Sequence, residues 1–181
     1  MDEEINVLAV GKPAPKFTAP AYHQGNVEAE VSLDDMKGKW VLLFFYPLDF
    51  TFVCPTEIIQ LNDMKSEFDA INCEIVAASI DSVFVHKGWA DADERIANIK
   101  YPIISDLTKE ISFDYGILHD DGMSLRGAFI IDPDGILRSM TINDLPVGRN
   151  PKELLRTIKA FQTGDLCPVN WKEGEKTLGK A

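Results

Sequence analysis

Residues 40–71 constrain the fold of this chain most strongly, because they place a buried strand directly before a helix. Residues 40–45 (WVLLFF) form an unbroken apolar run between a lysine-rich turn and Pro47, which is typical of a strand buried on both faces. From Ile58 to Ile71, apolar residues recur at intervals of three or four, which is typical of one face of an amphipathic helix. The sequence therefore predicts a strand, a short loop and a helix.

Cys54 lies at the junction between this loop and the helix. Pro55 follows it, and proline suits the first turn of a helix, where its missing N–H costs nothing. Cys54 would then lie among unpaired backbone N–H groups at the positive end of a helix dipole, which favours the reactive thiolate. Thr51 is close enough in a turn to hydrogen-bond the sulfur. This pattern predicts a cysteine nucleophile.

Charge and composition exclude several classes of protein. The chain has 181 residues, of which 45% are hydrophobic and 26% charged, as expected for one globular domain. Its net charge of -11 argues against binding to nucleic acid or to an anionic membrane. No apolar stretch is long enough for a membrane span, and the acidic residues 1–4 show no export signal. We therefore expect a cytoplasmic protein.

The cysteines and histidines do not form a metal-binding pattern. The cysteines are Cys54, Cys73 and Cys167, and no Cys-x-x-Cys pair occurs, which argues against a thioredoxin-type dithiol and a structural zinc site. The three histidines share no ligand-like spacing. Cys73 opens an apolar run and is interpreted as a core residue. We expect neither a metal nor a bound cofactor.

Strands and helices alternate along the chain, and a hairpin follows them. Asp134-Gly135 between two apolar runs is a strong hairpin signal. This order predicts an α/β protein of thioredoxin-like fold, with a central mixed sheet flanked by helices over residues 1–162. Residues 163–181 are predicted to form a C-terminal arm, with Leu166, Val169 and Trp171 as anchors for a partner surface. The predicted strands are 40–46, 73–80, 103–104, 127–132 and 136–142, and the predicted helices are 57–71, 83–99, 109–115 and 152–161.

The residues around Cys54 also match a known family. Pro47-x-x-x-Thr51-x-x-Cys54 resembles the peroxidatic-cysteine motif of the peroxiredoxins, and residues 49–57 (DFTFVCPTE) are similar to the typical two-cysteine branch. The short tail resembles the bacterial form, the alkyl hydroperoxide reductase C-like branch. Further similarity extends over segments 11–17, 79–82, 86–89, 101–106, 126–132, 143–149 and 167–171.

The resemblance implies a thiol peroxidase that reduces hydrogen peroxide and organic hydroperoxides and protects against oxidative stress. Cys54 would attack the peroxide and become a sulfenic acid. Arg126, at the start of a central strand, would stabilise the thiolate and donate to the peroxide. Thr51 would orient the peroxide, and Pro47 would shape and shield the pocket. Glu57 and Arg149 are expected to pair behind these groups.

The resemblance also implies a partner subunit and an electron donor. Cys167 would be the resolving cysteine, and Cys54 and Cys167 would form an interchain disulfide. A homodimer is expected through edge pairing of the hairpin strand, with five such dimers in a decamer. A thioredoxin-like protein or a flavoprotein disulfide reductase would reduce the disulfide. The sequence does not decide between the two donors.

Family members that are sensitive to excess peroxide carry a Gly-Gly-Leu-Gly insertion and a C-terminal Tyr-Phe helix. Neither motif occurs here: Trp89 is followed by ADADER, and the tail ends GEKTLGKA.

Two other functions stay open at this point. A cysteine hydrolase would need a histidine base near the thiol, and no histidine accompanies a segment predicted beside Cys54. A chaperone or scaffold role would persist without Cys54.

Overall fold

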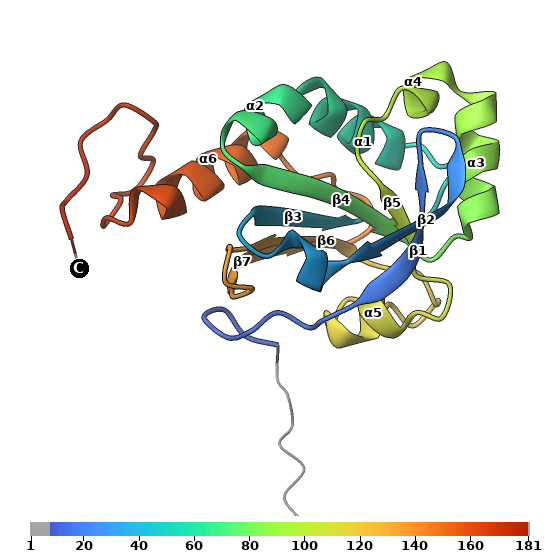
Figure 1. Ribbon diagram of the computed structural model, residues 1–181, viewed down its shortest axis with the longest axis horizontal. Helices are drawn as coiled ribbons and strands as arrows, with labels where there is room; N and C mark the ends of the chain where they lie inside the picture. Colours follow the sequence, from blue (N-terminus) through green and yellow to red (C-terminus); the bar gives the residue numbers. More distant parts are fainter. Residues whose placement is uncertain (1–7, 181) are drawn as a thin grey trace, which may run out of the picture.

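A computed structural model of the protein describes residues 8–180. The acidic residues 1–4, on which the expectation of a cytoplasmic protein partly rests, lie outside this range. A seven-stranded mixed sheet occupies the centre, in the order β2-β1-β5-β4-β3-β6-β7 (Figure 1). Its strands are β1 (Thr18–His23), β2 (Asn26–Ser32), β3 (Trp40–Phe45), β4 (Cys73–Ser79), β5 (Ile103–Ser105), β6 (Arg126–Ile131) and β7 (Leu137–Asn143).

Helices cover both faces of this sheet. Figure 1 shows α1 and α2 over one face and α5 against the other. In the described part of the chain, no helix is long and apolar enough to cross a membrane. The helices are the 3-10 helix η1 (Leu33–Met36) and the α-helices α1 (Cys54–Asp63), α2 (Lys65–Ala70), α3 (Val83–Ala92), α4 (Glu94–Ala97), α5 (Glu110–Asp114) and α6 (Pro151–Thr163).

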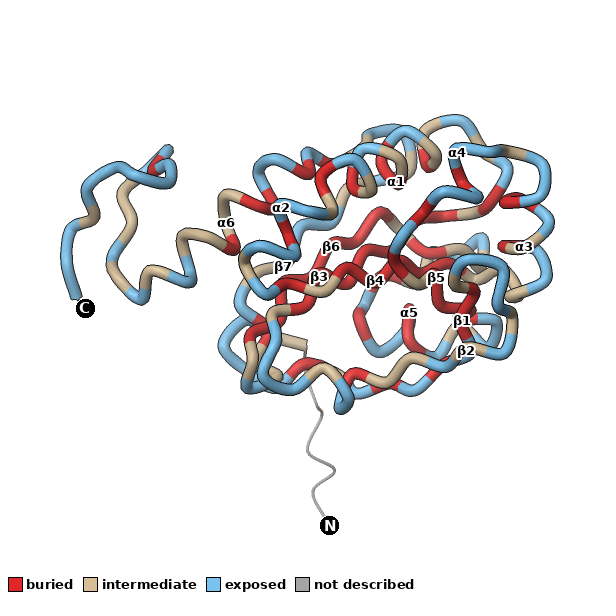
Figure 2. The backbone as a smooth tube through the Cα atoms, turned by 45° about the horizontal axis from the view of Figure 1, so that its top comes forward, coloured by how far each residue is buried: buried red, intermediate tan, exposed pale blue. Residues whose placement is uncertain are grey.

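Strand β3 organises the core, because it pairs with a neighbour along both edges. It runs parallel to β4 and antiparallel to β6. Its side chains alternate between the two faces: Leu42 and Phe44 join a cluster with α1 and α6, whereas Leu43 and Phe45 join a second cluster on the α5 side. Figure 2 shows that the buried residues concentrate in these central strands. The apolar run of the sequence is therefore buried on both faces, as predicted.

Most predicted elements are confirmed, with shifted ends. The predicted helix 57–71 begins three residues earlier, at Cys54, and divides at Met64 into α1 and α2. The predicted helix 83–99 is interrupted at Asp93, which has extended backbone angles and caps α4 with its carboxylate. The hairpin of β6 and β7 lies where Asp134-Gly135 predicted it. The β1–β2 pair was not predicted.

The C-terminal arm leaves α6 through Gly164, whose φ of 63° ends the helix. Figure 1 shows the arm, in red, extending from α6 away from the sheet. The sequence predicts that Trp171 anchors the arm on a partner surface, but the structure buries Trp171 within its own arm. It is 4% exposed, and its indole N–H donates to the Glu175 carbonyl oxygen of the same arm. Val169, in contrast, is 87% exposed.

Candidate active site

Cys54 is the first residue of α1 and is fully buried. The loop 46–53 carries the chain from the end of β3 to this position. Pro55 occupies the first turn of the helix, as predicted, so the helix starts at the cysteine. The sulfur therefore lies at the positive end of α1, where the first backbone N–H groups have no partner within the helix.

Arg126 reaches the same point from the neighbouring strand. Because β6 runs antiparallel to β3, its first residue lies beside the end of β3 that leads to the Cys54 loop. The Arg126 Nη1 atom donates to Cys54 Sγ at 3.5 Å and to Glu57 Oε2 at 2.8 Å. Its Nε atom donates to the Leu145 carbonyl oxygen at 2.6 Å, which fixes the guanidinium plane. The structure thus brings Cys54 and Arg126 together, as the family resemblance implies.

Glu57 and Arg149 pair behind this contact. Glu57 lies three residues after Cys54 on α1, so both side chains lie on the same side of the helix. Its carboxylate accepts from Arg149 N, Nε and Nη2 at 2.6, 3.0 and 3.1 Å. Arg149 Nη1 also donates to the Gly127 carbonyl oxygen, and its guanidinium lies 3.4 Å from the centre of the Phe44 ring. Burial lowers the pKa of Arg149, and its bonds to Glu57 oppose that shift.

These four side chains balance in charge only when Cys54 is ionised. The thiolate and Glu57 are then two negative groups, and Arg126 and Arg149 are two positive groups. All four are at most 7% exposed. A protonated thiol would leave an excess positive charge in the cluster, and an uncompensated buried charge is costly. The charges of the cluster therefore complement a thiolate, which is the nucleophilic form of cysteine.

Thr51 and Pro47 belong to the loop that precedes Cys54. The Thr51 hydroxyl donates to the Leu48 carbonyl oxygen at 2.9 Å rather than to the sulfur, which corrects the hydrogen bond suggested by the sequence. Because its proton is committed to that carbonyl, the Thr51 oxygen is available as an acceptor. Pro47 is buried directly after β3. Phe50 has a positive φ of 55°, and its ring packs 6.1 Å from that of Trp89.

A buried network that the sequence analysis did not find supports the same loop. The Asp49 carboxylate accepts from the Tyr46 hydroxyl at 2.6 Å and lies 2.7 Å from His86 Nδ1. Burial, and then the nearby Asp49 charge, raise the pKa of Tyr46 well above its usual range. These partners lie up to 37 residues apart in the sequence, so no local pattern indicated the network.

His86 also corrects the expectation that no histidine lies near the Cys54 segment. Its two ring nitrogens face Asp49 and, at 3.4 Å, the Ile104 carbonyl oxygen. Both ring nitrogens of His86 therefore face groups other than the Cys54 thiol. In the described residues Arg126, rather than an imidazole, is the side chain that donates a hydrogen bond to Cys54 Sγ. This arrangement lacks the cysteine–histidine pair that a cysteine hydrolase requires.

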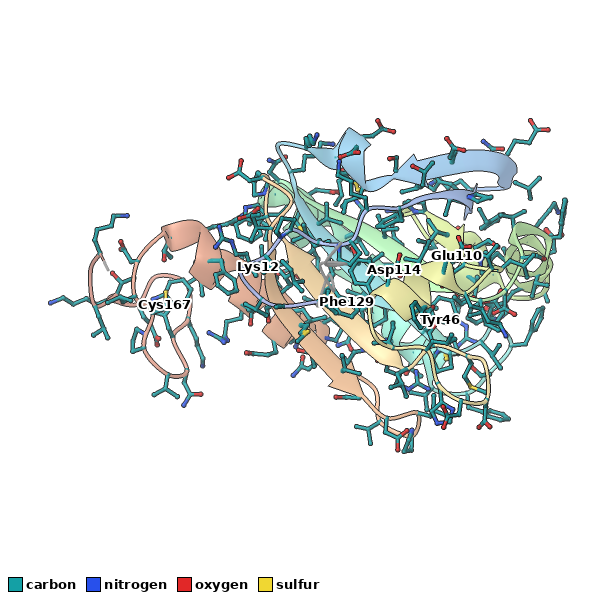
Figure 3. All side chains as sticks on the ribbon, turned by 90° about the horizontal axis from the view of Figure 1, so that it is seen from below. Lys12, Tyr46, Glu110, Asp114, Phe129 and Cys167 are labelled. Carbon is teal, nitrogen blue, oxygen red and sulfur yellow. The ribbon has the colours of Figure 1, made fainter. Side chains whose placement is uncertain are left out.

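The other two cysteines have different surroundings. Cys73 is 2% exposed, and burial raises its pKa to about 12, so it has the properties of a core residue. Cys167 lies on the arm, and Figure 3 shows it well away from Tyr46 and the body of the molecule. The structure therefore does not bring Cys167 near Cys54 of the same chain. All three cysteines are free.

Two further observations limit the chemistry of this site. Within residues 8–180, no group of three or more histidine, cysteine or acidic side chains is placed to hold a metal ion. An open groove beside the Cys54 loop is lined by Thr51, Phe52, Thr56 and Arg95, among others. Phe52, at its rim, is 95% exposed. Neither Cys54 nor Arg126 lines this groove, so the groove lies along the outer side of the loop. The site itself can offer a thiolate and guanidinium donors to a small polar substrate.

Comparisons with known proteins agree with this geometry. The sequence model described as the AhpC/TSA family matches residues 10–140. The chain is 50% identical to Peroxiredoxin-1 of Gallus gallus over 177 residues, which cover 93% of this chain and 89% of that protein. It is 49% identical to the thioredoxin peroxidase of Trypanosoma brucei rhodesiense, over 92% of this chain and 87% of that protein.

Solved structures show the same similarity. The reduced 2-Cys peroxiredoxin of Plasmodium vivax matches with a TM-score of 0.90 and 44% identity, over 94% of this chain and 93% of that one. The AhpC of Enterococcus faecalis matches with a TM-score of 0.85 and 39% identity, over 90% of this chain and all of that one.

Proposed function

The chain belongs to the AhpC/TSA family as a typical two-cysteine peroxiredoxin, and on that premise we propose that Cys54 attacks the peroxide and that Cys167 of a second subunit completes the reaction. The protein is a peroxidase that reduces peroxides. The observation that carries the assignment of Cys54 is its contact with Arg126 Nη1 at 3.5 Å inside a buried cluster that balances in charge only with a thiolate.

In the first step, the Cys54 thiolate attacks the terminal oxygen of the hydroperoxide. The S–O bond forms as the O–O bond breaks, so the peroxide hydroxyl stays on sulfur as a sulfenic acid. The other oxygen leaves with a negative charge and takes a proton from solvent, which gives an alcohol or water. Arg126 donates to the oxygens as this charge develops. The Thr51 oxygen, whose proton is committed to Leu48, accepts from the peroxide hydroxyl and orients it.

In the second step, the Cys167 thiol of the partner subunit attacks the sulfenic sulfur. An S–S bond forms, and the hydroxyl leaves with the thiol proton as water. Two observations support an interchain reaction: Cys54 is fully buried, and Cys167 lies on an arm directed away from the body of its own chain (Figure 3). Cys54 must leave the first turn of α1 to meet Cys167, so the loop unfolds locally during the cycle.

A homodimer would bring the two cysteines together. Strand β7 lies at the edge of the sheet and exposes Met140 and Ile142, each 41% exposed. An unpaired edge strand is a template for pairing with a second chain. A two-fold axis across this edge makes the β7 strands antiparallel neighbours and places each arm beside the other subunit.

A second apolar surface supports a ring of five such dimers. Phe84 and Leu107 are 71% and 63% exposed and line one hollow, and Phe113, which is 71% exposed, lines the next. Exposed apolar patches of this kind mark interaction sites. A repeated second interface closes into a ring when its rotation permits.

The disulfide must then be reduced by a dithiol donor. A relative with 49% identity is named a thioredoxin-dependent peroxide reductase, which supports a thioredoxin-like protein as the donor here. The similarity to the AhpC of Enterococcus faecalis supports a flavoprotein disulfide reductase as the alternative. A reducing compartment such as the cytoplasm keeps either donor in its dithiol form.

Rapid mixing of reduced protein with hydrogen peroxide, an organic hydroperoxide or an activated ester tests this function. We expect stoichiometric oxidation of Cys54 by either peroxide and no catalysed ester hydrolysis. Subsequent addition of a thioredoxin-like protein or of a flavoprotein reductase identifies the donor by the rate of thiol recovery. Ester turnover that exceeds peroxide consumption would show that the site is a hydrolase instead.

A further inference from the structure

Residues 177–180, near the C-terminus, fold back on the segment that precedes Cys167, and we call them the C-terminal strap. Leu166 N donates to the Gly179 carbonyl oxygen, and Leu178 N donates to the Leu166 carbonyl oxygen, both at 2.8 Å. Gly179 has a φ of 88°, a conformation that favours glycine. These bonds close residues 166–179, which include Cys167, into a loop.

Asp165 fastens this strap from the other side. Its carboxylate accepts from the Thr177 hydroxyl at 2.9 Å and pairs with Lys180 Nζ at 3.0 Å. The bonds from Lys180 and Thr177 lower the pKa of Asp165, so the carboxylate is ionised at neutral pH. A hydrogen bond to a charged group is stronger than one between neutral groups, whereas an exposed ion pair is screened by salt. The Thr177 hydroxyl therefore supplies a contact that does not depend on the exposed ion pair.

The closed loop is docked on α6. Trp171 is buried within it, and the Trp171 carbonyl oxygen accepts from Arg156 Nη1 at 2.9 Å. Lys159 pairs with Glu173 at 2.6 Å. Arg156 and Lys159 both belong to α6, so these contacts fix the loop to a rigid element. The strap is thus one part of a folded unit and not a loose chain end.

Cys167 lies inside this unit in weak contacts only. Its Sγ atom lies 3.4 Å from Thr163 Oγ1 and donates to the Ala160 carbonyl oxygen at 3.6 Å. The residue is partly exposed. Because sulfur forms weak hydrogen bonds, little free energy opposes release of the thiol from these two contacts.

We propose that the C-terminal strap, fastened by Thr177 on Asp165, positions Cys167 for the capture of the Cys54 sulfenic acid of the partner. This inference rests on the proposed resolving role of Cys167. A closed loop presents the thiol in a narrow range of positions, and the entropy of ordering it is lost on folding rather than during the reaction. An open chain end would lose that entropy in each cycle, which slows disulfide formation. Thr177 and Asp165 are positioning residues and do not contact the reacting atoms.

A matched pair of variants tests this proposal. Thr177→Val keeps the shape of the side chain and removes the hydroxyl, whereas Thr177→Ser keeps the hydroxyl. Full-length reduced protein is mixed with hydrogen peroxide and quenched with acid, and mass spectrometry counts sulfenic acid and disulfide at each time. We expect unchanged sulfenic acid formation in both variants. Disulfide formation should slow by about threefold or more in Thr177→Val, through the loss of one hydrogen bond to a charged group, and recover in Thr177→Ser.

Three further variants keep the test decisive. Deletion of 177–181 should slow disulfide formation more than Thr177→Val does, while Lys176→Ala, an exposed neighbour without a role in the strap, should match wild type. Wild-type or faster disulfide formation in both Thr177→Val and the deletion would overturn the role of the strap. Cys167→Ser separates this failure from a failure of the proposed function, because persistence of the disulfide in that variant would show that Cys167 is not the resolving residue.

Discussion

The Arg126 guanidinium donates to both Cys54 Sγ and Glu57 Oε2 from a single nitrogen, at 3.5 and 2.8 Å. The pairing of β6 with β3 fixes this relationship, because it brings the start of one strand beside the end of the other. Cys54 thus lies on a helix and Arg126 on a strand, and the rigid sheet sets their separation. Local unfolding of the loop can then remove Cys54 without moving Arg126.

Removal of the Arg126 guanidinium should slow the first step. In Arg126→Gln we expect sulfenic acid formation to slow by about a hundredfold, as for the loss of one donor to a developing charge elsewhere. Arg138→Gln is a suitable control, because Arg138 pairs with Asp132 at the other end of the hairpin. Stopped-flow rates with hydrogen peroxide measure the effect in both variants. A rate for Arg126→Gln within about twofold of the control would exclude this role.

Cys54 should be the only cysteine needed for reaction with peroxide. Cys73 is buried, and its pKa is raised to about 12, so it is a thiol at neutral pH. We expect Cys54→Ser to abolish peroxidase turnover and Cys73→Ser to retain it near the wild-type rate. Coupled assays with whichever donor restores the thiols fastest in the rapid-mixing experiment provide the comparison. Equal losses in the two variants would contradict the assignment.

The sequence predicts a contact of this site when the two contacting residues lie close together in the sequence, and does not predict it when they lie far apart. The apolar run before Cys54 and the periodicity after it indicate the strand, the loop and the helix, because those signals are local. Tyr46, Asp49 and His86 form a network whose geometry depends on how β3 and α3 pack, and no periodicity encodes that. Arg126 and Arg149 were assigned through resemblance, since they lie 69 and 92 residues from Glu57.

The first two strands show a different limit. Strand β1 contains Pro20, and proline within a run argues against an interior strand. Strand β2 carries Glu28 and Glu30 and is nowhere fully buried. Their pairing is visible only once the rest of the sheet supports them, so tertiary structure overrides the local signal.

The hollow lined by Phe84 and Leu107 should be needed for the proposed ring of five dimers. Phe84→Asp places a charge on that surface, so we expect reduced protein to fall from ten chains to two. Val10→Asp, at a residue that is 53% exposed and does not line the hollow, should leave the ring intact. Light scattering gives the mass of each species. A wild-type protein that is already a dimer, or a Phe84→Asp protein that stays a ring, would contradict the ring interface.

The protein should resist inactivation by excess peroxide. In the proposed cycle, the Cys54 sulfenic acid is either captured by Cys167 or oxidised further, and the outcome depends on how quickly the loop opens. Phe50 holds a left-handed conformation in this loop, which is unfavourable for a bulky residue and aids opening. We expect disulfide and little Cys54 sulfinic acid after turnover at rising peroxide, as measured by mass spectrometry. Abundant sulfinic acid at low micromolar peroxide would show that another contact holds the loop closed.

The proposed interchain disulfide is tested most directly by combining two inactive chains in one dimer. Cys54→Ser and Cys167→Ser are expressed together with different affinity tags, and the mixed dimer is purified under reducing conditions and then treated with hydrogen peroxide. Neither chain can form the Cys54–Cys167 disulfide alone. The account predicts a covalent heterodimer on a non-reducing gel, at twice the 20.2 kDa of the chain, joined through one Cys54 and one Cys167. Purified mixed dimers that run only as monomers after oxidation would contradict it.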